Sequence, residues 1–261
     1  MTLSPFRVDL HLHTVLSPCG ELEMGAPEIV AACRREGISL CAVTDHNAAD
    51  NAPAVAAAAA GNPVVIPGME VQSAEDIHMV VLFPDMETAR SFQEWLWLEM
   101  PPIPNKPEIF GEQLIIDGEN QIIGEQETLL VQGTGYGADE IAAEALGRGC
   151  LVIPAHLNRP SFSYEAVLGP LPDDFPCSAL ELSAALPRAD FQEWCRRYPG
   201  RLFIRSSDAH RLCEISKDRC TLMMLESPSF SELALALKGQ QGRSVLCPWE
   251  DFPSDRTSSS S

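Results

Sequence analysis

Basic residues are scarce in this chain of 261 residues. Its 18 lysines and arginines stand against 37 aspartates and glutamates, which gives a formal net charge of -19 at pH 7. No basic stripe runs along the sequence, so bulk electrostatics argue against a long nucleic acid or an anionic membrane as a partner. A small anionic substrate is still compatible with the charge, because bound divalent cations would invert the local field at a site.

The sequence also lacks an apolar run long enough to cross a membrane. It has no recognisable secretory leader, because the opening residues MTLSPFRVDL lead directly into a strand-like run. The nine cysteines are widely spaced, include no CxxC pair and are odd in number, which suits reduced thiols better than a disulfide framework. We therefore expect a cytoplasmic protein without a membrane partner. Nothing in the sequence indicates its oligomeric state.

Short apolar runs alternate with amphipathic helical patterns along most of the chain. We expect strands at residues 6–12, 38–43, 64–66, 79–83, 150–153, 179–182, 202–204 and 221–225, and helices at 26–35, 52–60, 87–98, 138–146, 189–197 and 231–237. This alternation predicts an α/β fold with a parallel sheet, open or closed into a barrel, in a single domain over residues 1–250. The serine-rich residues 251–261 are expected to form a disordered tail.

Residues 99–137 interrupt the alternation. Their first part, MPPIPNKPEIF, contains too many prolines for a helix, and QLIIDGENQIIGEQ has two apolar stretches joined through Asp117 and Gly118, which is a hairpin signal. We interpret the segment as an insertion that packs over or beside the main domain. A structural flap is favoured over a segment that contacts substrate.

The few histidines of this chain share one setting, a short polar cluster beside an apolar run. They are His11 and His13 in HLHT, His46 in TDHN, His78 in DIHMVV, His156 in PAHLNRP and His210 in SDAH. Any one histidine of this kind is more often a surface or core residue than a ligand. All six in the same setting indicate a metal site, because neutral imidazole is the commonest metal ligand in proteins.

The spacing within the clusters agrees with this interpretation. His11 and His13 are separated by one residue, which places both side chains on one face of a strand, as two ligands of one ion require. Asp208 and His210 have the same spacing. Most of the clusters follow a predicted strand, and the active sites of parallel α/β barrels gather where strands end.

Two further positions extend the set. Glu70 follows the predicted strand at residues 64–66, and its carboxylate could bridge two cations. His78 precedes its apolar run, yet the strand period of two allows its side chain to point inward. Carboxylate oxygens mixed with imidazoles favour zinc, manganese or iron over calcium. The set is too large for one structural zinc, which needs four ligands.

Together these motifs resemble those of the PHP family, the polymerase and histidinol phosphatase superfamily of metal-dependent phosphoesterases. The resemblance lies in HLHT, TDHN, GMEV with the following IHMVVLF, PAHLNRPS and SSDAH, in this order, and covers most of residues 6–83 and 150–225. It implies a distorted (β/α)7 TIM-like barrel with a trinuclear metal centre, in which a hydroxide shared between ions attacks a phosphoester.

The resemblance also implies how the ligands divide among two or three divalent ions. The three groups would be His11, His13, Glu70 and Asp208; Glu70, His78 and His156; and His46 with His210. Family members often complete the third site with an aspartate shortly after the HxH motif, but here residues 17–21 read SPCGE. Either Cys19 or Glu21 substitutes, or the third ion is weakly held. Cys19 is slightly favoured, since its deprotonated sulfur would suit zinc or iron, and a small buried cysteine is the alternative.

Other side chains are candidates for catalysis or substrate binding. Asp45 is expected to orient His46 or its loop, because a metal-bound imidazole gives its other N–H to an acceptor; a general acid is the alternative role. Arg159 is a candidate both for catalysis and for clamping a phosphate, with an ordinary surface salt bridge as the alternative. Three further candidate substrate contacts are Asn47, Asn158 and Ser161.

Three functions are compatible with the sequence. The favoured one is a phosphoesterase that acts on a small phosphorylated metabolite or a short oligonucleotide, because the acidic composition argues against long nucleic acid. A metal-dependent amidohydrolase is an alternative, but no lysine lies in a strand-end motif where it could bridge metals. A non-catalytic metal-binding or regulatory PHP domain is the third, and loss of ligands would be typical of it, whereas nearly all ligand positions are present here.

Overall fold

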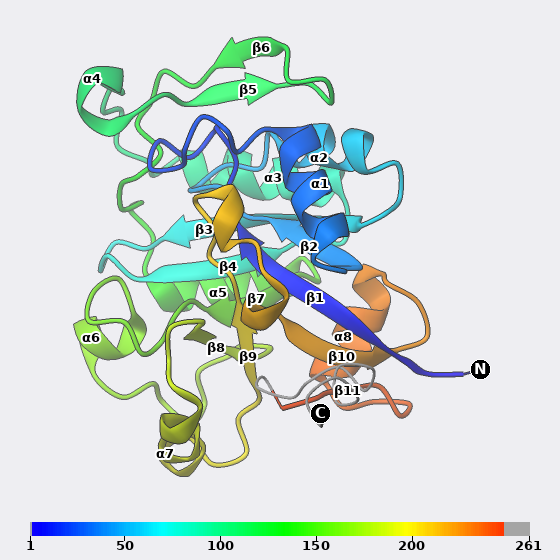
Figure 1. Ribbon diagram of the computed structural model, residues 1–261. Coiled ribbons are helices and arrows are strands. Elements are labelled where there is room, and N and C mark those ends of the chain that lie inside the picture. Colours follow the sequence, from blue (N-terminus) through cyan, green and yellow to red (C-terminus); the bar gives the residue numbers. More distant parts are fainter. Residues whose placement is uncertain (1, 248–261) are drawn as a thin grey trace.

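A curled seven-stranded sheet forms the centre of the computed structural model, which describes residues 2–247 (Figure 1). Along the sheet the strands are β11 (Ser244–Val245), β10 (Thr221–Leu225), β1 (Ser4–Leu12), β2 (Leu40–Val43), β3 (Val64–Gln72), β4 (His78–Leu82) and β7 (Leu151–Pro154). Two pairs lie apart from it, β5 (Leu114–Ile116) with β6 (Ile122–Glu125) and β8 (Leu180–Ser183) with β9 (Phe203–Ser206).

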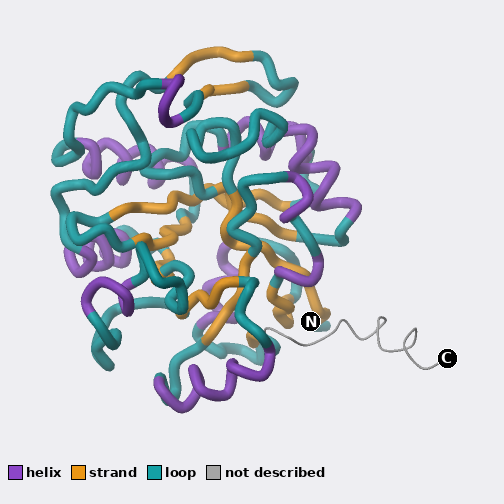
Figure 2. Tube along the Cα trace, turned by 60° about the vertical axis from the view of Figure 1, so that its left-hand side comes forward, coloured by secondary structure: helices purple, strands orange, loops and turns teal. Residues whose placement is uncertain are grey.

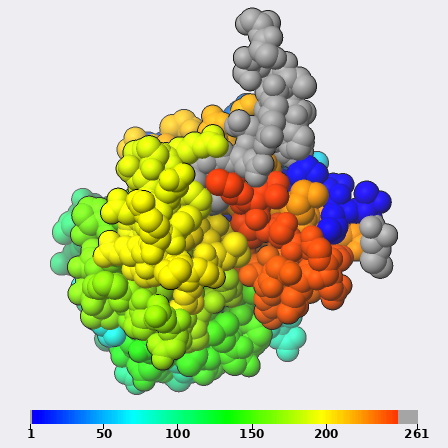
Figure 3. All heavy atoms as spheres, turned by 90° about the horizontal axis from the view of Figure 1, so that it is seen from below, coloured from blue at the N-terminus to red at the C-terminus, as the bar shows by residue number. Residues whose placement is uncertain are grey.

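Helices surround these strands, as the turned view in Figure 2 shows. They are α1 (Ala26–Arg35), α2 (Ala52–Ala59), α3 (Met86–Trp97), α4 (Pro107–Phe110), α5 (Ala138–Gly147), α6 (Tyr164–Leu168), α7 (Phe191–Arg197) and α8 (Phe230–Leu237). The insertion lies on one side of the molecule (Figure 1). Helices α7 and α8 lie on the opposite side, which faces the viewer in Figure 3.

The sheet is mixed, so the prediction of a parallel sheet holds only in part. Strand β2 runs parallel to both β1 and β3, and β8 runs parallel to β9. Strand β4 is antiparallel to both β3 and β7, and β10 is antiparallel to β1. The reason at β3 and β4 is the short link of residues 73–77, because a parallel crossover needs a dozen or more residues.

The sheet forms a half-barrel, whereas the family resemblance implies a distorted (β/α)7 barrel. The pair β8–β9 lies across the gap between β7 and β1. Ser178 N–H donates to the Val152 carbonyl of β7 at 2.7 Å, and Asp208 N–H donates to the His11 carbonyl of β1 at 2.8 Å. Among the described residues, these isolated bonds do not close the strands into a continuous hydrogen-bonded barrel. They do bring the end of β9 beside the end of β1.

Strand β3 is longer than expected, and this places Glu70. The strand expected from the sequence ends at residue 66 and is followed by Pro67 and Gly68, two residues that are rare in strand interiors. In the structure the strand continues to Gln72, where it pairs with His78 of β4. Glu70 therefore lies within a strand and not in the loop after it.

The predicted helices form close to their expected limits. Helix α1 has the predicted limits, with Pro27 in its first turn and Gly37 at φ +68° just beyond its end. Helix α3 begins at Met86 because the Asp85 carboxylate accepts a hydrogen bond from Thr88 N–H at 2.8 Å. These local signals act within one turn, which is why the sequence predicts them well.

The insertion forms the predicted hairpin, β5–β6, and is tied to the domain by amide side chains. Asn120, in the turn, accepts from Ala26 N–H at 2.8 Å and donates to the Glu28 carboxylate at 2.7 Å. On the other side, Asn51 accepts from Ile116 N–H at 3.0 Å. The hairpin is thus fixed to the start of α1 and to the residue before α2.

Two other expectations concern the end of the chain and membrane-spanning helices. The predicted tail at residues 251–261 lies outside the described residues, and the domain limits of 1–250 stay a prediction. Among the described residues, no helix combines the length and apolar character needed to cross a membrane.

Helix α3 offers a matched test of core packing. Leu96 is fully buried in the cluster that also contains Phe83 and Phe92, whereas Leu98, one residue beyond the helix, is 76% exposed. We expect Leu96→Ala to lower the free energy of unfolding by about 2–5 kcal/mol, because it removes buried methyl groups and leaves a cavity. The same change at Leu98 should cost less than about 0.5 kcal/mol. Urea unfolding followed by circular dichroism measures both, and equal losses would contradict this packing.

Candidate metal centre

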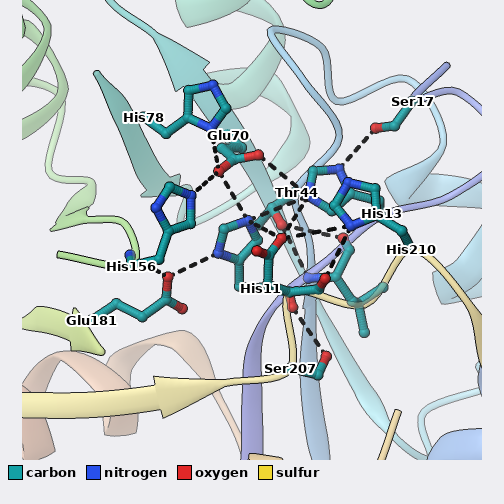
Figure 4. Close-up of polar contacts among 12 residues, drawn as sticks. His11, His13, Ser17, Thr44, Glu70, His78, His156, Glu181, Ser207 and His210 are labelled. Carbon is teal, nitrogen blue, oxygen red and sulfur yellow. Dashed lines mark hydrogen bonds and ion pairs between the residues drawn. The ribbon is translucent and has the colours of Figure 1, made fainter. Parts of the chain in front are cut away.

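The buried carboxylate of Glu70 is the meeting point of the site (Figure 4). Its side chain is 1% exposed and is surrounded by imidazole nitrogens from four other segments of the chain. Oε1 lies 2.9 Å from His78 Nδ1, 3.1 Å from His156 Nε2 and 3.3 Å from His11 Nε2, while Oε2 lies 3.1 Å from His46 Nδ1 and 3.3 Å from His13 Nε2.

Strand geometry explains why these side chains meet. His11 lies in β1 and His13 directly follows its last residue, Leu12, whose side chain points the other way into the core. His46 lies beyond β2 and forms an isolated parallel bridge with Glu70. The sheet thus continues past the formal end of β2.

Asp208 adds a second carboxylate from the loop after β9. Its Oδ1 lies 3.4 Å from His11 Nε2 and 3.5 Å from His13 Nε2. The residue has φ +51°, a left-handed conformation that is uncommon for a non-glycine residue, and its N–H is held by the His11 carbonyl. The ring of His210 stacks on that of His13, with centroids 4.1 Å apart.

Three groups of side chains have donor atoms close enough together to hold a cation. They are His11, His13, Glu70 and Asp208; His46, Glu70 and His78; and His13, His46 and His210. The first group is the one that the sequence analysis predicts. The second contains His46 where His156 is predicted, although His156 still contacts Glu70, and the third adds His13 to the predicted pair.

The atoms of this cluster fit bound divalent cations. Among the described residues, His46 Nδ1 and Asp208 Oδ1 are buried and have no hydrogen-bond partner. The Nε2 atoms of His11 and His13 lie 3.3 Å apart. Unpaired polar atoms are costly to bury, and nitrogen lone pairs that converge on one point repel one another unless a cation or proton lies between them. A divalent cation would satisfy both conditions.

Glu181 is a site residue that the sequence analysis missed. Its Oε2 lies 3.0 Å from His11 Nδ1 and accepts from His156 N–H, also at 3.0 Å. Burial alone would raise the pKa of this carboxyl, but the charge of His11 and the hydrogen bond to it lower the pKa below its usual value. The signal was present in the sequence, since Glu181 lies between Leu180 and Leu182 in a strand whose alternate side chains face opposite ways.

Ser17 plays a similar part for His13. Ser17 Oγ donates to Asp45 Oδ1 at 2.7 Å, so it accepts from His13 Nδ1, 2.9 Å away. The proton of His13 is thereby assigned to Nδ1, which leaves the Nε2 lone pair facing Glu70 and Asp208. Glu181 has the same effect on His11. Carboxylate or hydroxyl partners of this kind orient histidine ligands in metal sites.

Asp45 itself faces the loop and not the cavity. Besides Ser17 Oγ, it accepts from the N–H and the hydroxyl of Thr14, each at 2.7 Å, and it is fully buried. Burial raises the pKa of its carboxyl, against the lowering effect of His13 and these hydrogen bonds. Through Ser17 Oγ, which also accepts from His46 N–H at 3.2 Å, Asp45 contacts both His13 and His46, and its expected role of orienting His46 or its loop stays a prediction.

A cavity of about 390 Å³ opens above the cluster. His46, Glu70, His78, Asp208 and His210 form its floor, and its other walls are Cys19, Val131, Arg159, Pro160, Ser161 and Phe162. Arg159 Nη1 donates to Asp208 Oδ2 at 2.7 Å. The structure thus brings the predicted Arg159 and Ser161 to the site. Val131 shows that the insertion also reaches it, although a flap without such contact was the favoured interpretation.

Two predicted substrate contacts do not line this cavity. Asn47 donates to the carbonyls of Leu130 and Gln132, at 2.7 and 2.9 Å, and accepts from Gln72 N–H at 3.0 Å. These hydrogen bonds hold the last part of the insertion, at residues 130–132, against β3, so the Asn47 amide is occupied. Asn158 accepts from Ser183 N–H at 2.7 Å and so fastens its own loop to the end of β8.

The two candidates for the third site lie in different places. Cys19 is exposed and lines the cavity, so the alternative of a small buried cysteine is wrong; partial desolvation of the thiol together with the charge of Glu70 raises its pKa to about 12. Glu21 is exposed and pairs with Arg211 at 3.0 Å. Neither residue belongs to the three groups described above, and Cys19 is the one of the two that faces the site.

We compared the chain with protein families, curated proteins and solved structures. No protein-family model matches the chain. The uncharacterized protein YqxK of Bacillus subtilis is 26% identical over 177 residues, which are 65% of this chain and 38% of that protein. This chain therefore spans well under half the length of that relative.

Solved structures give a more extensive match. The lesion-specific endonuclease Q of Pyrococcus furiosus superposes on 94% of this chain with a TM-score of 0.66 and 20% identity, and 60% of its own length is covered. A proposed metal-dependent phosphoesterase of Bifidobacterium adolescentis matches 78% of this chain and 87% of its own, with a TM-score of 0.51 and 19% identity. An amidohydrolase of Chromobacterium violaceum covers the same shares, with a TM-score of 0.52 and 17% identity.

Glu181 provides a test of this centre. We expect Glu181→Gln to weaken zinc binding about 10–100-fold, because the amide no longer stabilises the orientation and basicity of His11. Competition with a chromophoric chelator measures the affinity. Glu193→Gln, an exposed change on α7, is the control and should bind zinc as the unmodified protein does. Unchanged affinity in Glu181→Gln would show that this carboxylate does not support a metal ligand.

The resemblance to the PHP superfamily that the motifs predict is thus supported at the level of the fold: the chain shares its fold with proteins that include endonuclease Q and a proposed metal-dependent phosphoesterase, and its histidines gather with Glu70 and Asp208 at one site.

Proposed function

We propose that this protein is a metal-dependent hydrolase of phosphoric esters. The observation that carries the proposal is the convergence of five imidazoles and Asp208 on the buried Glu70 carboxylate, at the floor of a cavity of small-molecule size. In the reaction, a water oxygen forms a bond to phosphorus, the bond from phosphorus to the leaving oxygen breaks, and the leaving alcohol takes up a proton.

The residues present would hold two or three divalent ions of zinc, manganese or iron. Ions in such a site lower the pKa of water towards neutrality and stabilise negative charge at phosphorus. Glu70 stays ionised for this purpose, because burial raises the pKa of its carboxyl less than the surrounding histidines lower it. His11 and His13 would present Nε2 to the ions, while Glu181 and Ser17 hold their Nδ1 atoms.

Arg159 is proposed to bind a phosphoryl oxygen. One guanidinium nitrogen holds Asp208 Oδ2, and its other N–H groups are available to an anion in the cavity that Arg159 lines. Ser161, on the same loop, offers a hydroxyl. Asp45 is proposed to act as a positioning residue for the segment of residues 14–17, since it does not line the cavity.

Two kinds of phosphoester substrate are proposed. A small ester fits the cavity and the net charge of -19, which opposes a long polyanion. A nucleic-acid phosphodiester is the second candidate, because a structure of endonuclease Q with an abasic DNA duplex matches 94% of this chain with a TM-score of 0.63. That likeness speaks against the expectation that long nucleic acid is excluded.

We also propose that the protein is cytoplasmic.

The first test measures activity directly. Protein loaded with manganese or zinc should hydrolyse a phosphomonoester or a phosphodiester, and chelation should abolish the activity. We expect Glu70→Gln to lower kcat/KM roughly 100-fold or more, since the bridging charge is lost. The control Glu94→Gln changes an exposed residue of α3 and should leave kcat/KM unchanged. Turnover of amide substrates, with none of any phosphoester, would instead favour an amidohydrolase.

The second test concerns Arg159. We expect Arg159→Ala to raise KM for a phosphomonoester and to lower kcat/KM about tenfold or more, because a charge-assisted contact to phosphate is lost. Arg148→Ala is the matched control, since it removes an arginine that pairs with Glu144 on α5, away from the cavity. An unchanged KM in Arg159→Ala would mean that this arginine only holds Asp208.

A further inference from the structure

The loop that follows His156 places one aromatic ring in the wall of the cavity. Phe162 lines the cavity and is 43% exposed. Its backbone has φ +57°, which is rare for a bulky residue, and its carbonyl accepts from His78 N–H at 2.9 Å. Backbone strain of this kind is typical of functional sites, where the surrounding structure maintains it.

The ring is held in a defined plane by its neighbour. Phe162 stacks on the imidazole of His78, with centroids 4.8 Å apart and planes 24° from parallel. His78 in turn directs Nδ1 to Glu70 Oε1 at 2.9 Å. The orientation of the phenyl ring therefore follows from that of a residue at the centre of the site. One of its faces is covered by His78, while a large part of the ring is still accessible.

The surroundings of the ring are apolar. Val131 and Pro160 line the same cavity, and Asn47 holds Val131 in place through the carbonyls of Leu130 and Gln132, on either side of it. Among the described residues of the wall, hydrogen-bonding groups are concentrated near the metal centre and on Arg159 and Ser161. A ligand beside Phe162 thus meets apolar surface, while its phosphoryl group meets the polar floor.

From this arrangement we infer that the substrate carries a planar nucleobase next to its phosphoryl group, and that Phe162 is the stacking platform for that base. Phenyl rings stack on every base because each base has a π-face, and such contacts tolerate differences in sequence. An alkyl or sugar phosphate would leave the accessible face of Phe162 without a partner. The inference rests on the proposed function and names the substrate class of the same site.

The test compares adenosine monophosphate with ribose 5-phosphate, which differ by the base alone. We expect kcat/KM for the nucleotide to exceed that for the sugar phosphate at least tenfold in the zinc-loaded protein. In Phe162→Leu this preference should fall by about tenfold, mainly through KM for the nucleotide. Phe110→Leu is the matched control, because Phe110 is also 43% exposed but lies on α4, away from the cavity. It should keep the full preference.

Binding of adenosine, followed by ligand-observed NMR, separates this inference from the proposed function. If no phosphoester is hydrolysed but adenosine binds and Phe162→Leu alone abolishes its binding, the phosphoesterase proposal fails and the platform stands. If phosphoesters are hydrolysed without preference for the nucleotide, and adenosine binds no better than ribose, the platform is overturned. Equal losses of adenosine binding in Phe162→Leu and Phe110→Leu would overturn it too.

Discussion

A single carboxylate, that of Glu70, has imidazole nitrogens around both of its oxygens, and the rest of the site depends on this contact. Burying an ionised carboxylate costs several kcal/mol unless opposite charges and hydrogen bonds compensate for lost water. The histidines provide part of this compensation, but they share the same lack of solvent and repel one another when protonated. Divalent cations inside this cluster of two carboxylates and six imidazoles would balance its charges and satisfy its unpaired atoms. The stability of the site and its chemistry then have one cause.

The groups behind the histidines show how the fold prepares that balance. Glu181 and Ser17 accept hydrogen bonds from the Nδ1–H groups of His11 and His13, so that both Nε2 atoms face inward. Asp45 holds Ser17 and is itself satisfied by the N–H and hydroxyl of Thr14. Tautomers are thus set from β8 on one side and from the loop after β1 on the other. A change in either element would reach the centre without touching a ligand.

Much of the site follows from the sequence because it depends on strand periodicity. The spacing of His11 and His13 brings them to one face, as it does for any strand, and Asp208 reaches the same point from the end of β9, whereas Glu70 reaches it from within β3. Glu181 obeys the same rule but lacks a histidine beside it, so its pattern was not recognised. The roles of Asn47 and Val131 could not be predicted in this way, since they depend on where the insertion returns to the sheet. The antiparallel β4 was missed because a strand pattern carries no direction.

Bound cations would invert the charge of the cavity and so reconcile the acidic composition of the chain with the proposed function. A chain with a net charge of -19 repels anions at long range, and the two carboxylates of the centre would do the same at short range. The two or three divalent ions of the proposed function would carry more positive charge than Glu70 and Asp208 carry negative, so a loaded cavity floor would attract phosphate. Arg159 strengthens this effect because it lies at the same wall, while salt screens the acidic surface beyond about 10 Å. Under the proposed function, selection among anions would therefore be made inside the cavity, where the shape of the wall and the ring of Phe162 would act on a ligand held by the ions.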